Sequence, residues 1–112
     1  MNDLTEMHCI SYEGEGFTLD EPQARDLLGQ VHNWKANEST TEIEKTFRFK
    51  NYYRTMAFVN AVAWVAHQED HHPLLEVGYN YCTVRYSTHS VGGLSKNDFI
   101  CAAKLDALVA SQ

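Results

Sequence analysis

Residues 41–50 alternate between apolar and polar side chains, and this alternation constrains the fold more than any other feature of the sequence. From position 43 onwards, Ile43, Phe47 and Phe49 fall on one side, where Lys45 is the single exception, and the other side is polar throughout. A period of two with one wet face is typical of an antiparallel strand that is buried on one side only. We therefore expect a sheet whose apolar face is covered by helices.

Helical and extended patterns follow one another along the rest of the chain. Helices are predicted over residues 19–31, from 51 or 55 to 70, and from 95 onwards, and strands over residues 33–37, 41–50 and 77–87. This order is typical of an α+β fold, with helices on one face of a mainly antiparallel sheet. A length of 112 residues is close to the commonest domain size, so residues 1–112 are expected to form a single domain.

Local signals support these boundaries. Thr18 followed three positions later by Glu21 has the spacing of a capping box at the start of the first helix. Ser95 and Asp98 have the same spacing at the start of the last helix. Pro73 is expected to end the long second helix, because the residue before a proline is pushed out of the helical region.

Charge and composition exclude several classes of protein. Nine Lys and Arg against fifteen Asp and Glu give a net charge of −6, which disfavours nucleic acid as the main partner. The longest uncharged apolar stretch, residues 56–66, is far shorter than the roughly 20 residues of a membrane-spanning helix. No secretory signal is recognisable, and three scattered cysteines (Cys9, Cys82 and Cys101) favour free thiols. We expect a cytoplasmic protein.

Four of the six histidines lie between positions 67 and 89, and they are the strongest candidates for chemistry. His67, His71 and His72 are concentrated where the long helix ends, and His89 follows the last predicted strand. Histidine changes its charge between about pH 5 and 8, so it is suited to proton transfer near neutrality. A single histidine at a helix end is more often an ordinary surface residue, but the concentration of four favours a site.

Other kinds of site find less support. His67 and His71 have the i, i+4 spacing of metal ligands, but the glutamate of the zinc proteases is missing at both known offsets, so no metal is expected. No serine or cysteine has the surroundings of an activated nucleophile, and Gly92-Gly93 is too short for a phosphate-binding loop. Trp64 fits the interior of the long helix, whereas Trp34, beside polar neighbours, is a candidate to line a site.

A set of short motifs with fixed gaps is more specific than any of these patterns. The motifs are His71-His72-Pro73, Tyr79, Ser87-Thr88-His89, Gly93-Leu94-Ser95 and Asp98. In this arrangement the chain resembles the pterin-4a-carbinolamine dehydratase family, and the similarity extends over roughly residues 20–110. Position 67 is His where many members carry Glu, and position 97 is Asn where vertebrate members place Arg.

The resemblance implies a fold and an activity. The fold would be a four-stranded antiparallel sheet with about three helices on one face. Family members dehydrate 4a-hydroxytetrahydrobiopterin to quinonoid dihydrobiopterin, without metal or cofactor, and so recycle the pterin that aromatic amino-acid hydroxylases use. The implied partners are the pterin substrate and the hydroxylase pathway; charge and the short apolar stretch already argue against nucleic acid and membrane as partners. Some animal members also bind a homeodomain transcription factor as a dimerisation cofactor. The alternatives to the enzyme are therefore a non-catalytic regulatory or dimerisation-cofactor module and a molybdopterin-related role.

The resemblance also implies roles for individual residues. His71, His72 and His89 would be catalytic, with His71 and His89 handling protons and His72 mainly holding the pterin. The C4a hydroxyl leaves only when it is protonated and N5 must lose its proton, so the reaction needs one donor and one acceptor. The implied substrate-binding residues are His67, Asp70, Pro73, Trp34, Ser87, Thr88 and Asp98.

Association of several copies is expected as well. A strand as long as residues 77–87, with apolar side chains on both faces, would leave more surface than one small domain can cover. The family resemblance likewise implies dimers or tetramers. We therefore expect a homodimer or a homotetramer.

Overall fold

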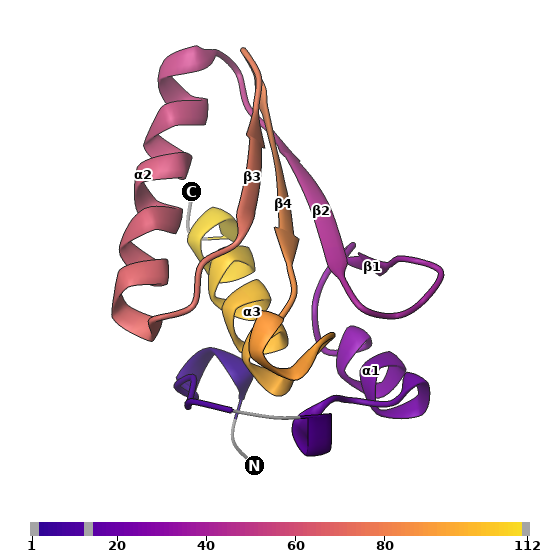
Figure 1. Cartoon of the computed structure of the whole chain (residues 1–112). Coiled ribbons are helices and arrows are strands. Elements are labelled where there is room, and N and C mark those ends of the chain that lie inside the picture. The colour runs from indigo at the N-terminus through magenta and orange to yellow at the C-terminus, as the bar shows by residue number, and fades with distance from the viewer. Residues whose placement is uncertain (1–2, 13–14, 111–112) are drawn as a thin grey trace.

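The computed structural model describes residues 3–12 and 15–110, and within them it contains three α-helices and four strands (Figure 1). The helices are α1 (Glu21–Leu28), α2 (Tyr52–Glu69) and α3 (Lys96–Ala110), and the strands are β1 (Lys35–Ala36), β2 (Ile43–Arg48), β3 (Leu74–Val77) and β4 (Tyr81–Tyr86). Short 3-10 turns occur at Leu4–Glu6, Glu15–Phe17 and His89–Val91. The α+β fold expected from the sequence is confirmed.

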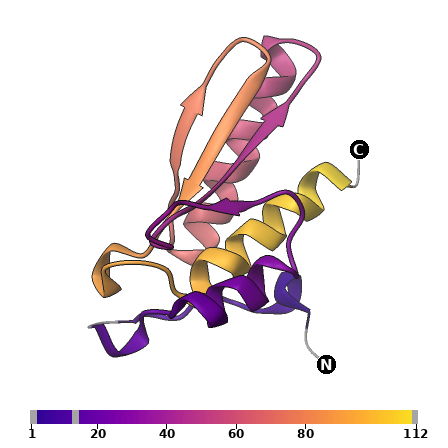
Figure 2. The ribbon, with the colours of Figure 1, turned by 90° about the vertical axis from the view of Figure 1, so that its right-hand side faces the viewer.

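The strands form one antiparallel sheet in the order β1-β2-β4-β3. β2 and β4 are the central pair, and their register sets Ile43 opposite Tyr86 and Phe47 opposite Cys82. α2 and α3 lie against the same face of the sheet, and α1 packs against α3 (Figure 2). None of the helices in the described residues is long and apolar enough to cross a membrane.

The prediction of one strand over residues 77–87 is wrong, because this part of the chain contains a hairpin. β3 ends at Val77, and the chain turns so that Gly78 N–H donates to Tyr81 O at 2.9 Å. A Cβ atom at position 78 would lie 2.0 Å from the Tyr81 ring, so any larger residue would have to displace that ring. The β-branched and aromatic composition of both strands conceals the turn between them. The fourth strand is the one that the family resemblance implied.

The core lies between the sheet and the helices. Ile43 and Phe47 of β2 are buried, as the alternation predicts. Lys45, the exception on the same side, places its Nζ 2.6 Å from Asp106 Oδ1 of α3 and 4.6 Å from the centre of the Phe47 ring. The exception is therefore an ion pair at the edge of the core. The other large core residues include Phe58, Val62, Val84, Tyr86, Phe99, Ile100 and Leu105.

Two local predictions are corrected. The N-cap of α1 is Asp20 rather than Thr18, since Asp20 and Gln23 exchange side-chain and backbone hydrogen bonds of 2.9 Å as a capping box. Thr18 instead donates its hydroxyl to Val91 O. Trp64 is 63% exposed rather than interior, because α2 buries one narrow face against the sheet and leaves the opposite face open.

Candidate active site

The end of α2 directs His71 into the molecule. Asp70, which follows the helix, has a left-handed backbone with φ 50° and ψ 44°, and His71 N–H then bonds to Ala66 O at 3.1 Å. A left-handed residue of this kind closes a helix and turns the chain sharply. α2 therefore ends before Pro73, as predicted, and His71 turns back towards α3.

His71 is fixed by two contacts. Its Nε2 lies 2.6 Å from Asp98 Oδ1, and the side chain of His71 is 11% exposed while that of Asp98 is fully buried. The imidazole also stacks on the ring of Tyr86, with centroids 5.7 Å apart and planes 7° from parallel. A carboxylate and an aromatic ring together leave the imidazole little freedom to rotate.

The second oxygen of Asp98 is also occupied. Oδ2 accepts hydrogen bonds from Thr88 Oγ1 at 2.8 Å and from Ser95 N–H at 3.0 Å, and the two hydroxyls of Thr88 and Ser95 lie 2.7 Å apart. Asp98 is the third residue of α3, so its carboxylate lies at the positive end of the helix dipole. The buried carboxylate of Asp98 thus links His71 to Thr88, just after β4, and to Ser95, just before α3.

This network defines the tautomer of His71. An ionised carboxylate can only accept hydrogen bonds, so Nε2 carries the hydrogen that is donated to Asp98. In the neutral ring Nδ1 then keeps a free lone pair, and it has no hydrogen-bond partner within the part of the chain that the structure describes. A histidine held in one tautomer by a buried carboxylate is suited to accept and return a proton at its other nitrogen.

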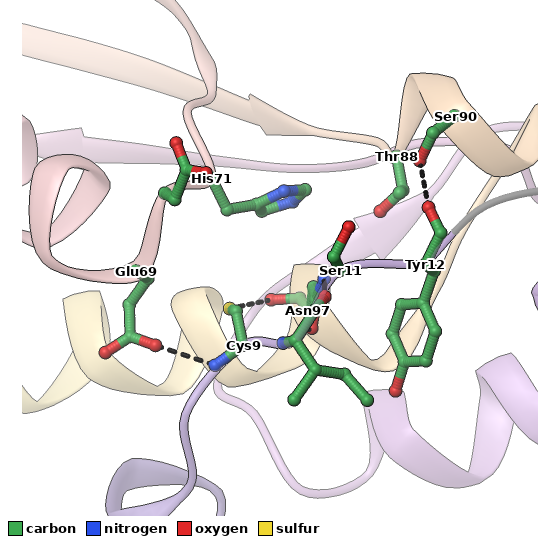
Figure 3. Close-up of a pocket in the computed structure, with 10 residues that line it drawn as sticks. Cys9, Ser11, Tyr12, Glu69, His71, Thr88, Ser90 and Asn97 are labelled. Carbon is green, nitrogen blue, oxygen red and sulfur yellow. Dashed lines mark hydrogen bonds between the residues drawn. The ribbon is translucent and has the colours of Figure 1, made fainter.

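A cavity of about 270 Å³ opens beside His71 (Figure 3). Its walls come from residues 9–12, from the end of α2, and from the segment that leads into α3. The lining residues include Ser11, Asp70, His71, Thr88, Ser90 and Asn97. The volume is close to the lower end of the range for small-molecule sites, and each of the segments that form the walls contributes polar side chains.

The structure brings some of the candidate site residues together. His71, Thr88 and Asp98 form the hydrogen-bonded network, and Asp70 lines the same cavity. Thr88 also lines a neighbouring hollow of about 320 Å³, together with Ser87 and His89. Thr88 therefore lies between the hollow that contains His89 and the cavity that contains His71.

The remaining candidate residues lie outside the network. His72 is exposed and Pro73 is partly buried, immediately after His71. His67 is exposed on α2, with its ring 6.3 Å from that of Trp64. Trp34 is buried in the core, where its Nε1 donates to both oxygens of Asp106 at 3.1 and 3.2 Å.

Several residues of the cavity were not anticipated from the sequence as site residues. Residues 9–12, Glu69 and Ser90 carry no motif, and Asn97 drew attention only as a difference from vertebrate family members. The contacts that bring residues 9–12 to the cavity join positions 60 to 87 residues apart. No local pattern encodes such contacts.

The cysteines are poor candidates for chemistry. All three are free thiols, as predicted. A hydrogen bond with Cys101, at 3.5 Å between the sulfur atoms, raises the pKa of Cys9, and burial raises it further. Burial also raises the pKa of Cys82 to about 11. Cys9 and Cys82 are therefore neutral thiols near pH 7, which are weak nucleophiles.

The i, i+4 pair His67 and His71 does not form part of a cluster of metal ligands in the described residues. Within residues 3–12 and 15–110, no group of three or more His, Cys, Asp or Glu side chains is arranged to hold a metal ion. His67 and His71, which have the spacing of ligands, face different surroundings, since His71 is engaged by Asp98 and His67 is exposed.

Comparison with known proteins identifies the family. A family model described as Pterin 4 alpha carbinolamine dehydratase matches residues 18–108. The chain belongs to this family. A protein of Legionella pneumophila (strain Corby) that carries the same family name is 53% identical over 109 residues, which cover 96% of each chain. One of Xanthomonas campestris pv. campestris (strain B100) is 57% identical over 101 residues, or 90% of this chain and 86% of the relative.

Solved structures of dehydratase-family proteins share the fold. A crystal structure from Brucella melitensis, described as a transcriptional coactivator/pterin dehydratase, has a TM-score of 0.78 at 28% identity and covers 81% of this chain and 97% of that one. A pterin dehydratase-like protein described as a RuBisCO assembly factor of the alpha-carboxysome has a TM-score of 0.61 at 27% identity, covering 72% and 94%. The family resemblance found in the sequence is thus confirmed.

Proposed function

We propose that this protein dehydrates 4a-hydroxytetrahydrobiopterin to quinonoid dihydrobiopterin. The observation that carries the proposal is the buried Asp98–His71 pair, with a separation of 2.6 Å, at the wall of a cavity. The pair presents the lone pair of Nδ1 as a proton acceptor, and membership of the dehydratase family supplies the substrate class.

In the proposed reaction the C4a–O bond breaks, the hydroxyl takes up a proton and leaves as water, and N5 loses its proton as the C4a=N5 bond forms. The steps balance without an electron donor or acceptor. His71 accepts the N5 proton at Nδ1, and His89 protonates the departing hydroxyl from the neighbouring hollow. His72 holds the pterin. Proton transfer by a positioned side chain contributes ~10²–10⁴-fold to the rate.

A dehydration assay on the full chain tests this proposal. The substrate is 4a-hydroxytetrahydropterin freshly generated by an aromatic amino-acid hydroxylase, and its loss is followed by absorbance. We expect a saturable acceleration over the spontaneous reaction, proportional to protein concentration and unchanged by a metal chelator. Folded protein that leaves the spontaneous rate unaltered would refute the proposed activity.

A non-catalytic partner-binding role is the second candidate. One structural neighbour is described as a RuBisCO assembly factor, so this fold serves assembly in at least that protein. The three hydrogen bonds that Asp98 accepts favour catalysis here, because a surface that only bound protein would not need a buried carboxylate to orient the imidazole of His71.

We also propose that the chain forms a homo-oligomer. The large exposed apolar side chains include Tyr53 at 80%, Trp64 at 63% and Leu74 at 63%, on α2 and on the edge strand β3. A second copy would cover this surface and protect the exposed edge of the sheet. Sedimentation at micromolar concentration is expected to give a dimer or tetramer, and a stable monomer would contradict the proposal.

A further inference from the structure

Residues 9–12 form a wall of the His71 cavity, although they precede residues 18–108, which the family model matches. Ser11 lies in the middle of this segment, and its side chain points towards the gap between His71 and Thr88 (Figure 3). Its hydroxyl makes no hydrogen bond to any residue that the structure describes. A hydroxyl can donate or accept a hydrogen bond, so it is available to a ligand in the cavity.

The segment is held in place by the side chain of Asn97. Asn97 is 5% exposed, its Nδ2 donates to Ile10 O at 2.6 Å, and its Oδ1 accepts from Ile10 N–H at 3.1 Å. Two opposed hydrogen bonds to one residue fix both the position and the orientation of the backbone at Ile10. The neighbouring residue, Ser11, is thereby aimed into the cavity.

Two further contacts anchor the segment on either side of Ser11. Cys9 N–H donates to Glu69 Oε1 at 2.7 Å, and Ser90 Oγ donates to Tyr12 O at 2.7 Å. Burial alone would raise the pKa of Glu69, but hydrogen bonds from Cys9 and His8 and the charge of Lys104 hold it below its usual value. Glu69 is therefore an ionised anchor at neutral pH, and Ser11 is carried by a backbone fixed at both ends.

We infer that Ser11 is a substrate-contacting residue of the pterin site and that Asn97 is the residue that positions it. The inference rests on the proposed dehydratase function. The Ser11 hydroxyl hydrogen-bonds a polar edge of the bound pterin, whose ring nitrogens, amino group and carbonyl offer both donors and acceptors. The contact is made equally in the ground state and in the transition state, so it contributes to binding rather than to the chemical step.

Steady-state kinetics of Ser11→Ala and Asn97→Ala test the inference. Ser11→Ala should raise KM by about three- to tenfold, the effect of one lost hydrogen bond, while kcat stays within about twofold of the wild-type value. Asn97→Ala should raise KM at least as much, because it releases the segment that carries Ser11. Asn97→Asp keeps an acceptor for Ile10 N–H and should give a smaller rise. Ser39→Ala is the matched control. The hydroxyl of Ser39 contacts Thr41 in the turn after β1, so its loss should leave KM unchanged.

Binding of 7,8-dihydrobiopterin, measured by fluorescence quenching, separates the two hypotheses. Wild-type protein that neither dehydrates substrate nor binds this dihydropterin would overturn both. Protein that binds it, with Kd raised in Ser11→Ala but no dehydration, would support the contact and refute only the activity. Active wild-type protein whose KM and Kd are unchanged in folded Ser11→Ala would overturn the inference alone.

Discussion

His71→Ala is expected to lower kcat by ~10²–10⁴-fold, because the variant loses the nitrogen that accepts the substrate proton in the proposed reaction. KM should change little, since the walls of the cavity remain. The imidazole also packs against Tyr86 and bonds Asp98, so the variant is to be checked by circular dichroism and thermal unfolding before its kinetics are measured. The dehydration assay then gives kcat and KM separately.

The companion variants define the roles. His89→Ala should also lower kcat strongly, and the double variant with His71→Ala should be little worse, because the proposed reaction needs both proton transfers together. His72→Ala should raise KM more than it lowers kcat. His67→Ala should have the smallest effect of the four, since this histidine is exposed on α2 near Trp64. Near wild-type kcat in folded His71→Ala and His89→Ala would overturn the assignment.

Asp98→Asn is expected to lower kcat on the order of 10²-fold with KM nearly unchanged. Asp98 now accepts hydrogen bonds from three donors, and the NH₂ group of an asparagine would face one of them with a donor of its own. The Nε2–H of His71 is then no longer held towards residue 98. The same loss should reduce the free energy of unfolding by about 1–3 kcal/mol. Steady-state kinetics and urea denaturation measure the two effects.

An exposed carboxylate provides the matched control for Asp98. Asp26→Asn changes the same chemical group on the surface of α1 and should leave both kcat and the free energy of unfolding near their wild-type values. If Asp98→Asn lost stability but kept wild-type kcat, Asp98 would be purely structural. The comparison of kcat with the free energy of unfolding therefore distinguishes positioning of His71 from general support of the fold.

The parts of the fold that depend on local pattern were predictable. The alternation around Ile43 and Phe47 and the stop before Pro73 reflect physics within a few residues of each position. The hairpin at Gly78 was missed because both strands have the same β-branched and aromatic composition. The burial of Trp64 was predicted wrongly because periodicity shows that a helix has an apolar side but not how much of it the sheet covers.

The candidate site likewise contains residues that could be predicted from the sequence and residues that could not. His71, Thr88 and Asp98 belong to the family motifs, and the structure joins them by hydrogen bonds. The wall formed by residues 9–12 was not predicted, because it depends on contacts with Glu69 and Asn97 that are distant in sequence. Such contacts emerge only after the sheet and helices have assembled.

The position of Asp98 affects how other members of this family can be interpreted. Its carboxylate completes the start of α3 through Ser95 N–H as well as orienting His71. A family member without catalytic activity would still need this carboxylate to begin the helix, whereas nothing in the helix start requires an imidazole at position 71. Retention of the aspartate is therefore weak evidence that a homologue is an enzyme. Loss of the histidine at position 71 is the more informative sign that a family member has a function other than dehydration.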